Sequence, residues 1–330
     1  MKSLNKFILI HKYIAQYVGY IYIVLCPAIS LNAEDELIKY GDFDSWITRS
    51  IKESRIVGGE TKTLYEIGPK GTFDGERAFT NQGGCPWANS NVYAKVAGVV
   101  KTNVTVYPDD HNGGKAAKLC TQIVKCKAIG VMNISVLAAG SVFLGSMLEP
   151  VTSSKDPMSK INVGIPFTRR PKALKIDYKY EASKEPNRIY ESGFGKTKTI
   201  QGADQAEMTL LLQKRWEDAN GNIHAKRVGT MRHRIGKSTD GWKEDSVFDI
   251  HYGNISKESF YKDWMKLLTG DEAYYALNSK GENVPIQEEG WAGEDEEPTH
   301  IILKFDSSYG SAYVGSVGST LWIDNVRLVY

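Results

Sequence analysis

The segment GSTLWIDNVRLVY, residues 318–330, decides how the sequence is interpreted. Under strict strand alternation, Leu321 and Ile323 face one side of a sheet, whereas the two apolar residues after Asn325 face the other side. A β-bulge, one extra residue at Asp324-Asn325, returns all of these apolar side chains to the same face. We therefore predict a buried, bulged strand, in which the bulge turns the Asp324 carboxylate toward a neighbouring element.

Other segments show the same short β pattern. In ALKIDYKYE, residues 173–181, apolar and charged side chains alternate, which is typical of a strand with one buried face. TLLLQKRWEDANGNIHAKRVG, residues 209–229, predicts a tight hairpin, because Asn220-Gly221 readily adopts positive φ. Further strands are expected within NVYAKVAGVV, MNISVLAAGSVFL and HIILKF. Short strands separated by turn residues favour a sandwich over a βαβ fold.

One segment is expected to be helical. SKESFYKDWMKLL, residues 256–268, carries an apolar stripe at helical spacing formed by Phe260, Trp264, Leu267 and Leu268. Such a helix would cover an edge of the sandwich. The predicted fold is therefore all-β dominated, a jelly-roll β-sandwich with one or two short helices.

Residues 1–33 are predicted to be a secretory signal peptide, because lysines flank an apolar run that small residues ending at Ala33 follow. A membrane helix is the alternative, but the run is interrupted and shorter than the ~20 residues that a bilayer requires. Lipid attachment at Cys26 is a further alternative. We expect an exported protein, located in the periplasm, at the outer surface or outside the cell, with no transmembrane span after cleavage.

Residues 34–330 are expected to form one large domain, with a boundary near residue 155 as the alternative organisation. The chain has 41 Lys and Arg against 39 Asp and Glu, and the two signs are interleaved. A protein that binds nucleic acid usually has clustered positive charge. Nucleic acid is therefore not expected as a partner.

Three cysteines follow the expected signal peptide. If Cys120 and Cys126 share one strand, their separation of roughly 20 Å is too long for a disulfide. Whether Cys85 pairs with one of them stays open, and buried free thiols are the alternative interpretation. No Cys-x-x-Cys sequence occurs, so a thiolate zinc site is not indicated.

The pairing of GDFDSW, residues 41–46, with LWIDNVRLV near the end resembles the first and last strands of calcium-containing jelly-roll carbohydrate-binding modules, whose ends read like GDFE and IDDV. This resemblance implies a structural Ca²⁺ held by Asp44 and Asp324, since calcium prefers hard oxygen ligands. Here Asp replaces the Glu and Asn325 replaces the second Asp, so the ligand charge is lower. We expect the bulge to turn Asp324 toward Asp44.

A second resemblance extends over much of the chain. The segments IPFTRRPKALKIDYKY, LLLQKRWEDANGNIHAKRVGTM and STLWIDNVRLVY are similar to those of the putative carbohydrate metabolism domain family of exported bacterial proteins. IKESRIVGGETKTLYEIGP, VLAAGSVFLG and KGENVPIQEEGW strengthen the similarity. It implies a galactose-binding-like sandwich and a part in extracellular glycan use, with polysaccharide or oligosaccharide as partner. It supplies no catalytic residues.

Sugar sites combine aromatic planes with carboxylates and amides. Two tryptophans lie in polar, glycine-flanked segments of this character, GGCPWANSN and EEGWAGEDEE. The residues expected to contact a glycan are Trp87, Asn89, Asn91, Trp291, Glu288 and Glu289. The alternative is that both tryptophans anchor loops on the sandwich. Core positions suit Trp216, Trp264 and Trp322 better, and the role of Trp242 is undecided.

No catalytic constellation stands out. The acidic run over residues 288–297 is typical of a solvated loop rather than of an acid–base pair. Asp109-Asp110-His111 is interpreted as a solvated turn, and no Gly-x-Ser-x-Gly elbow occurs. The leading hypothesis is a non-catalytic glycan-binding or surface-recognition protein. A glycoside hydrolase and a structural or adhesive surface protein that binds other proteins, including cell-surface proteins, are the alternatives.

Overall fold

The computed structural model describes residues 34–128, 132–153, 156–193 and 195–330. The expected signal peptide lies outside the described residues. Residues Asp35–Tyr330 form one compact unit. Within the described part of the chain, no helix has both the length and the apolar character needed to cross a membrane.

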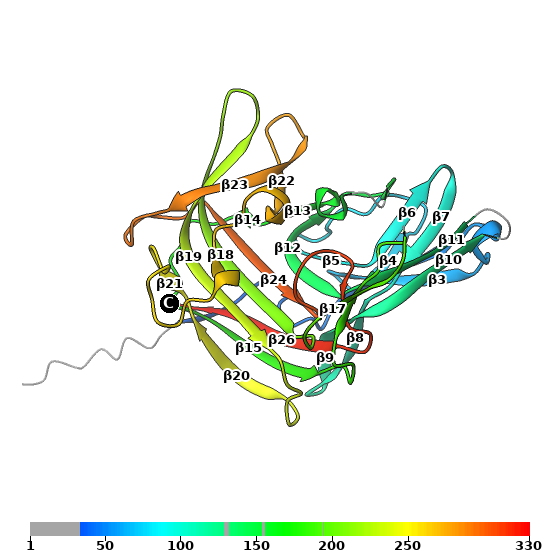
Figure 1. The fold of residues 1–330 in the computed structure, drawn as a ribbon, viewed down its shortest axis with the longest axis horizontal. Helices are drawn as coiled ribbons and strands as arrows, with labels where there is room; N and C mark the ends of the chain where they lie inside the picture. Colours follow the sequence, from blue (N-terminus) through cyan, green and yellow to red (C-terminus); the bar gives the residue numbers. More distant parts are fainter. Residues whose placement is uncertain (1–33, 129–131, 154–155, 194) are drawn as a thin grey trace, which may run out of the picture. The chain divides into compact units, whose positions relative to one another are not determined.

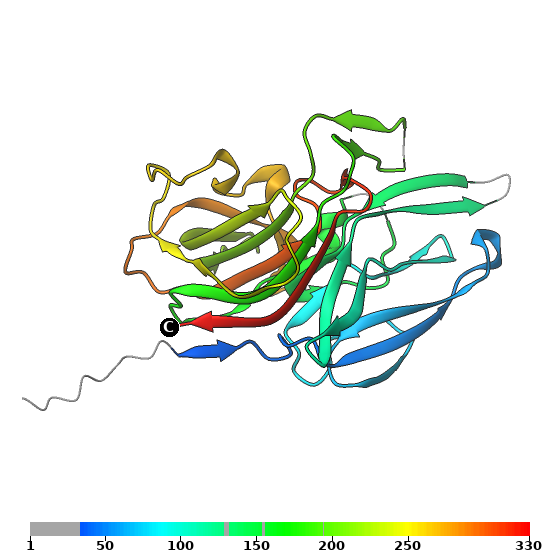
Figure 2. The ribbon, with the colours of Figure 1, turned by 90° about the horizontal axis from the view of Figure 1, so that it is seen from below.

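Two sheets dominate this unit (Figure 1). The first is six-stranded, with the order β20 (Lys243–Asp249), β15 (Ala173–Glu181), β26 (Thr320–Val329), β9 (Gly114–Cys120) and β8 (Val106–His111). Its sixth strand, β1 (Asp35–Leu37), pairs with β26. Figure 2 shows the blue β1 running beside the red β26, which brings opposite ends of the described chain together.

The second sheet is ten-stranded, with the order β13 (Ile161–Val163), β12 (Ser141–Met147), β24 (His300–Asp306), β18 (Ala206–Glu217), β19 (Ile223–Ile235), β23 (Asn283–Trp291) and β22 (Tyr275–Leu277). Three further strands attach to it: β14 (Ile165–Pro166) to β24, β21 (His251–Tyr252) to β19 and β5 (Trp87–Asn89) to β12. The contact between β19 and β23 is parallel.

Smaller elements complete the described part of the chain. Two three-stranded sheets consist of β3 (Thr61–Ile67), β2 (Trp46–Lys52) and β4 (Gly71–Asp74), and of β17 (Lys198–Ile200), β16 (Arg188–Tyr190) and β25 (Val314–Gly315). Two hairpins are β6 (Val92–Val96) with β7 (Val99–Asn103), and β10 (Gln122–Ala128) with β11 (Met132–Ala138). The described helices are short 3₁₀ turns: η1 (Arg55–Val57), η2 (Pro157–Lys160), η3 (Asp263–Met265) and η4 (Gly270–Glu272).

The main core lies between the two large sheets. Alternation places Leu174 and Ile176 of β15 on its inner face, where they join Leu210 and Leu212 of β18 in one buried cluster. Burial of apolar area at roughly 25 cal/mol per Å² makes this layer the main source of stability. The all-β jelly-roll sandwich predicted from the sequence is confirmed.

The predicted bulge is confirmed in β26. The register against β15 shifts between Lys175 and Asp177, and Asn325 adopts a φ of 52°. As a result the four apolar side chains on either side of the bulge all enter the main core: Leu321, Ile323, Val326 and Leu328.

The predicted helix over residues 256–268 is wrong. Only η3 forms there, because the aromatic residues of the stripe take separate partners instead of one common face. Phe260 stacks on His251 with ring centroids 4.1 Å apart, whereas Trp264 lies 4.4 Å from the Arg234 guanidinium. A short segment gains too little from helical hydrogen bonds to resist such tertiary contacts.

The predicted hairpin is present as β18 and β19, but its turn is longer than expected. The last pair is Glu217 with Ile223, so residues 218–222 form a five-residue loop. The Asp218 carboxylate accepts hydrogen bonds from the backbone N–H groups of Asn220 and Asn222 and so organises this loop. Of the cysteines, Cys85 and Cys120 are free thiols.

Candidate functional site

The first predicted sugar-contacting tryptophan is not available to a ligand. Trp87 is 1 % exposed, its indole packs against Phe43, and its Nε1 donates to the Lys39 carbonyl oxygen at 3.0 Å. A ring buried in this way has no face for a pyranose. The prediction that Trp87 binds a glycan is wrong: Trp87 is the first residue of β5 and lies in the main core, so it does not anchor a loop either.

Asn89 and Asn91 are also structural. Both amide groups donate to the Tyr65 carbonyl oxygen, at 2.9 and 2.8 Å. The Asn91 side-chain oxygen accepts the backbone N–H groups of Thr105 and Val106, each at 2.9 Å. Because both asparagines are buried and satisfied by backbone groups, their predicted role in binding a glycan is wrong.

Glu288 is a buried ion-pair partner rather than a surface ligand. Its carboxylate binds the Arg227 guanidinium, and both side chains are fully buried. Gln213 Nε2 and the Leu268 N–H each donate to it at 2.7 Å. Burial opposes ionisation of Glu288, but Arg227 outweighs it and lowers the pKa of the carboxyl group. The predicted glycan contact at Glu288 is therefore wrong. Trp291, another predicted contact, is partly exposed, and its ring centroid lies 5.5 Å from the guanidinium carbon of Arg227.

The predicted calcium ligands do not converge on each other. Asp324 Oδ2 lies 2.6 Å from His111 Nδ1, whereas Asp44 Oδ1 accepts the Lys115 N–H at 2.7 Å. Among the described residues, no group of three or more acidic, His or Cys side chains has a metal-binding arrangement. The side chains around Asp324 therefore do not fit calcium, because the imidazole of His111 lies against the carboxylate oxygen that would have to coordinate the ion.

His111 is buried and lies at the end of β8, so the predicted solvated turn at Asp109-Asp110-His111 is wrong at this residue. Its ring stacks on Trp242 with centroids 3.7 Å apart, and its Nε2 lies 3.2 Å from Glu244 Oε1. Asp324 and Glu244 raise the pKa of His111 although its burial opposes this. Burial in turn raises the pKa of Asp324 to about 6.

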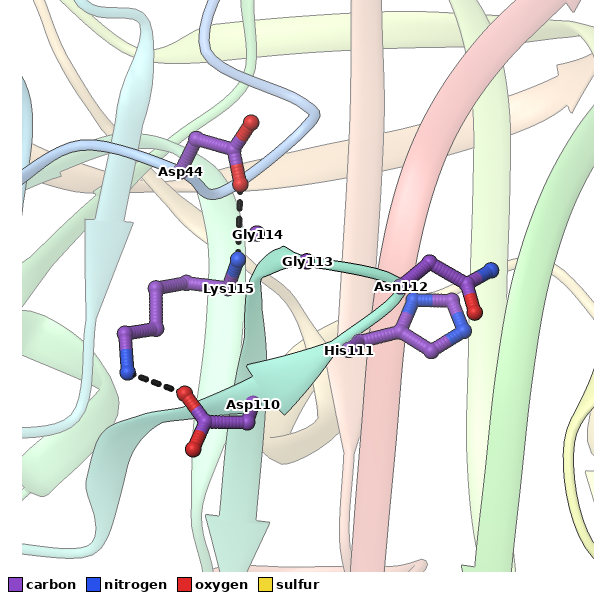
Figure 3. A pocket seen from close by; sticks show the side chains of 7 residues that line it. All are labelled: Asp44, Asp110, His111, Asn112, Gly113, Gly114 and Lys115. Atoms are coloured by element: carbon purple, nitrogen blue, oxygen red, sulfur yellow. Dashed lines mark hydrogen bonds and ion pairs between the residues drawn. The ribbon is translucent and has the colours of Figure 1, made fainter.

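A polar hollow of about 610 Å³ adjoins this histidine (Figure 3). Asp44, Asp110 and Lys115 line it together with the hairpin turn after His111. Figure 3 shows the Lys115 and Asp110 side chains on one side of the hairpin and the His111 ring on the other. The three charged side chains of the hollow bind one another or the backbone, and among the described residues no Trp, Tyr or Phe side chain lines it.

The exposed aromatic plane lies elsewhere, at the outer end of the hairpin between β18 and β19. Trp216 is 41 % exposed, so its predicted place in a core is wrong. Its indole stacks on the imidazole of His224, with ring centroids 5.5 Å apart and an angle of 15° between the planes. The two residues are direct cross-strand partners, which explains the stacking.

Carboxylates surround this pair. Glu289 Oε1 lies 2.6 Å from His224 Nδ1, and Asp218 Oδ2 lies 3.4 Å from His224 Nε2. Burial opposes a charge on His224, but the hydrogen bonds and charges of Glu289 and Asp218 together outweigh it and raise the pKa of this imidazole. Of the residues predicted to bind a glycan, Glu289 is the one beside the exposed Trp216 and His224 pair. Its own side chain is half exposed.

A bulge in β23 places Glu289 there. Ala225 pairs with Glu288 and Lys226 pairs with Gly290, so Glu289 is the extra residue of the bulge. The bulge lets two successive glutamates take different roles, since Glu288 enters the sheet interior and Glu289 turns to His224. We name Trp216, His224 and Glu289 the Trp216 platform.

The Trp216 platform offers what a sugar ring needs. The indole supplies an apolar plane for the C–H face of a pyranose, and carboxylate and imidazole groups beside it accept or donate hydrogen bonds to hydroxyls. Sequence reasoning missed Trp216 because the apolar run before it suggests a buried strand throughout. The charged and polar residues on both sides, in QKRWED, are the signal that the strand has left the core by that point.

One protein family and several solved structures are similar to this chain. The family described as putative carbohydrate metabolism domain matches residues 65–329. A solved structure of a putative glycoside hydrolase from Bacteroides thetaiotaomicron is 20 % identical with a TM-score of 0.46, covering 86 % of this chain and 70 % of that chain. A putative glycoside hydrolase from Bacteroides vulgatus is 15 % identical with a TM-score of 0.39, covering 90 % and 95 %.

A carbohydrate-binding module specific for non-crystalline cellulose is 10 % identical, with a TM-score of 0.26, covering 74 % of this chain and 86 % of that chain. No curated protein matches the chain. The match over residues 65–329 makes this region a carbohydrate-related domain, and it includes the whole Trp216 platform.

Proposed function

Since the chain belongs to the putative carbohydrate metabolism domain family, we propose that it is an exported, non-catalytic protein that binds polysaccharide or oligosaccharide at the Trp216 platform. The observation that carries the proposal is the exposed indole of Trp216 stacked on His224 beside the Glu289 carboxylate. An exposed indole with polar groups at its edge suits a sugar ring, because the indole covers the apolar C–H face of a pyranose and the polar groups bind its hydroxyls.

The platform itself favours binding over catalysis. Hydrolysis of a glycosidic bond normally needs two carboxyl groups roughly 5 to 9.5 Å apart, one of which is protonated. At the platform the two carboxylates nearest the indole, Glu289 and Asp218, both contact His224, whose raised pKa favours an imidazolium. Hydrogen bonds from the Asn222 side chain and backbone N–H also hold the pKa of Asp218 well below its ordinary value, so Asp218 does not suit the role of general acid.

The alternative function, glycoside hydrolysis, is favoured by one separate observation. Glu207 of β18 and Asp306 of β24 are direct cross-strand partners, so two carboxyl groups lie on neighbouring strands of the ten-stranded sheet. Both are bound by cations, Glu207 by Arg232 and Arg234 and Asp306 by Lys304. Both carboxylates are therefore engaged in ion pairs within the sheet, which again favours binding.

Affinity gel electrophoresis against a panel of soluble polysaccharides tests the proposal. At least one polysaccharide should retard the protein, and Trp216→Ala should remove the retardation. Val247→Ala is the control, because Val247 is an exposed apolar residue on a different sheet, 56 % exposed on β20. Retardation that survives Trp216→Ala would reject the platform, and a protein that no polysaccharide retards would reject glycan binding and favour the adhesive alternative.

Enzyme activity is tested on the same panel by release of reducing sugar. The binding proposal expects none. Release that disappears in both Glu207→Gln and Asp306→Asn, with unchanged thermal unfolding, would replace it by glycoside hydrolysis. Export is tested by sequencing the N-terminus of the protein from the native host, where we expect a start at residue 34.

A further inference from the structure

The ten-stranded sheet has an outer face, turned away from the main core, with two different halves. One half is apolar and belongs to a second cluster that includes Phe143, Leu211 and Ile302. The other half is charged, although its residues belong to the same strands. We name this second half the charged face and define it by Glu207, Arg232, Arg234, Lys304 and Asp306.

The strand register arranges the charged face in two rows. In the first row Asp306, Glu207 and Arg234 are successive cross-strand partners. In the second row Lys304, Thr209 and Arg232 are successive partners. Each row therefore crosses β24, β18 and β19, and Thr209 stands between two cations. Residues two positions apart in a strand share a face, which gives all six side chains the same direction.

The charges of this face do not balance. Arg232 and Arg234 both bind Glu207, and Lys304 binds Asp306, which also accepts a hydrogen bond from the Ser141 hydroxyl. Three cations thus face two carboxylates. The side chains are 6 to 15 % exposed, so solvent screens this excess of positive charge only weakly.

Polar atoms inside the charged face lack partners. Thr209 Oγ1 and Arg232 Nε are buried and have no hydrogen bond to any described residue. Thr209 is 1 % exposed, and the Arg232 side chain is 9 % exposed. A buried polar group without a partner costs about 1–3 kcal/mol, so its presence in a native structure needs an explanation.

Aromatic rings hold one of the cations in place. The Arg234 guanidinium lies 4.4 Å from the Trp264 ring and 4.2 Å from the Tyr309 ring. Its Nε and Nη2 bind Glu207, so the Nη1 donors point away from that carboxylate. Arg188 stacks on Tyr309 at 3.9 Å, and its Nε is buried without a described partner. A second arginine therefore lies at the rim of the charged face.

We propose that the charged face is a second binding site, which takes the oxyanion of an acidic sugar residue. This inference rests on the proposed glycan-binding function and names the class of glycan. An anion bound by Arg234 and Arg188, which both stack on Tyr309, would neutralise the excess positive charge, and arginine binds carboxylate and sulfate groups in a planar, bidentate way. The sugar ring attached to that anion would lie against Tyr309 or Trp264.

Isothermal titration calorimetry with trigalacturonate and its methyl ester tests the proposal, because esterification removes only the charge. The acid should bind the wild-type protein at least tenfold more tightly than the ester. This affinity ratio should decrease when the salt concentration is raised from about 0.05 to about 0.5 M. Arg234→Gln and Arg188→Gln should each remove most of the ratio. Arg188 is the safer variant, since none of the described carboxylates forms an ion pair with it.

A third titration uses a sulfated oligogalactoside as the ligand. Tighter binding of the sulfate than of the uronate supports the same oxyanion site with sulfate as its source. Equal binding of acid and ester by the wild-type protein overturns the inference, as does an unchanged ratio in a folded Arg188→Gln variant. Trp216→Ala separates the two proposals: loss of ester binding with the acid preference retained supports both sites. Binding of neutral glycans alone rejects only the acidic site.

Discussion

His111 Nδ1 lies 2.6 Å from Asp324 Oδ2, and this contact joins the hairpin of β8 and β9 to the strand β26. The pKa of each group is raised in the folded protein, that of Asp324 to about 6. A raised pKa means that the folded state holds its proton more tightly than the unfolded state does. The stabilising effect of these protons is therefore present at acidic pH and is lost as the pH rises through the folded pKa values.

We accordingly expect His111→Gln to lower the thermal unfolding midpoint more at pH 5.5 than at pH 8, two values on either side of the ordinary histidine pKa of about 6.5. Thermal melts across this range measure the difference. Asp324→Asn should flatten the same pH dependence. A midpoint difference that is constant from pH 5.5 to pH 8 would contradict the proton-linked contact.

Calcium should not stabilise the protein through Asp44 and Asp324, because Asp324 is bound by an imidazole. A ligand that binds the native state must raise the unfolding midpoint. Melts with millimolar calcium and with chelator should coincide. A calcium-dependent rise that Asp324→Asn abolishes would restore the metal site expected from the resemblance.

Glu288→Gln should destabilise the protein by about 3–5 kcal/mol, because it leaves the fully buried Arg227 charge without its partner. Glu289→Gln is the matched control, as the neighbouring residue is half exposed and its loss should cost less than about 1 kcal/mol. Urea unfolding measures both. Equal effects of the two substitutions would mean that the Arg227 charge is not buried in solution.

Asn325 should tolerate glycine better than valine, because its φ is 52°. A β-branched residue is strained in this region by roughly 1–2 kcal/mol, whereas glycine is not. Both variants lose the hydrogen bond from Asn325 Nδ2 to Asp177 Oδ2, so their difference isolates the backbone effect. Urea unfolding that ranks valine at or above glycine would contradict the bulge geometry.

Much of the fold follows from local pattern. The strand over residues 173–181 and the bulge at Asn325 were predictable because alternation of apolar side chains reports directly which face is buried. The helix over residues 256–268 was not, since its stripe reflects separate tertiary contacts of Phe260 and Trp264. A local pattern does not show which partner each side chain will meet.

The candidate sites were harder to predict, because they depend on strand pairing. Trp87 lies in a polar segment but is covered by Phe43 and by the core, whereas Trp216 follows an apolar run and is exposed. The charged face draws its residues from the hairpin of β18 and β19 and from β24, which is distant from that hairpin in sequence. Charged residues inside apolar strands, such as Lys304 and Asp306 in IILKFD, were the available signal.

The position of β26 has a consequence for how the chain folds. This strand pairs with β15 on one side and with β9 and β1 at its other edge, yet it is the last strand of the described chain to be synthesised. The six-stranded sheet cannot close around its centre before residues 320–329 have emerged. Contacts that join such distant positions form slowly. We expect the rate of folding to be limited by the docking of this final strand.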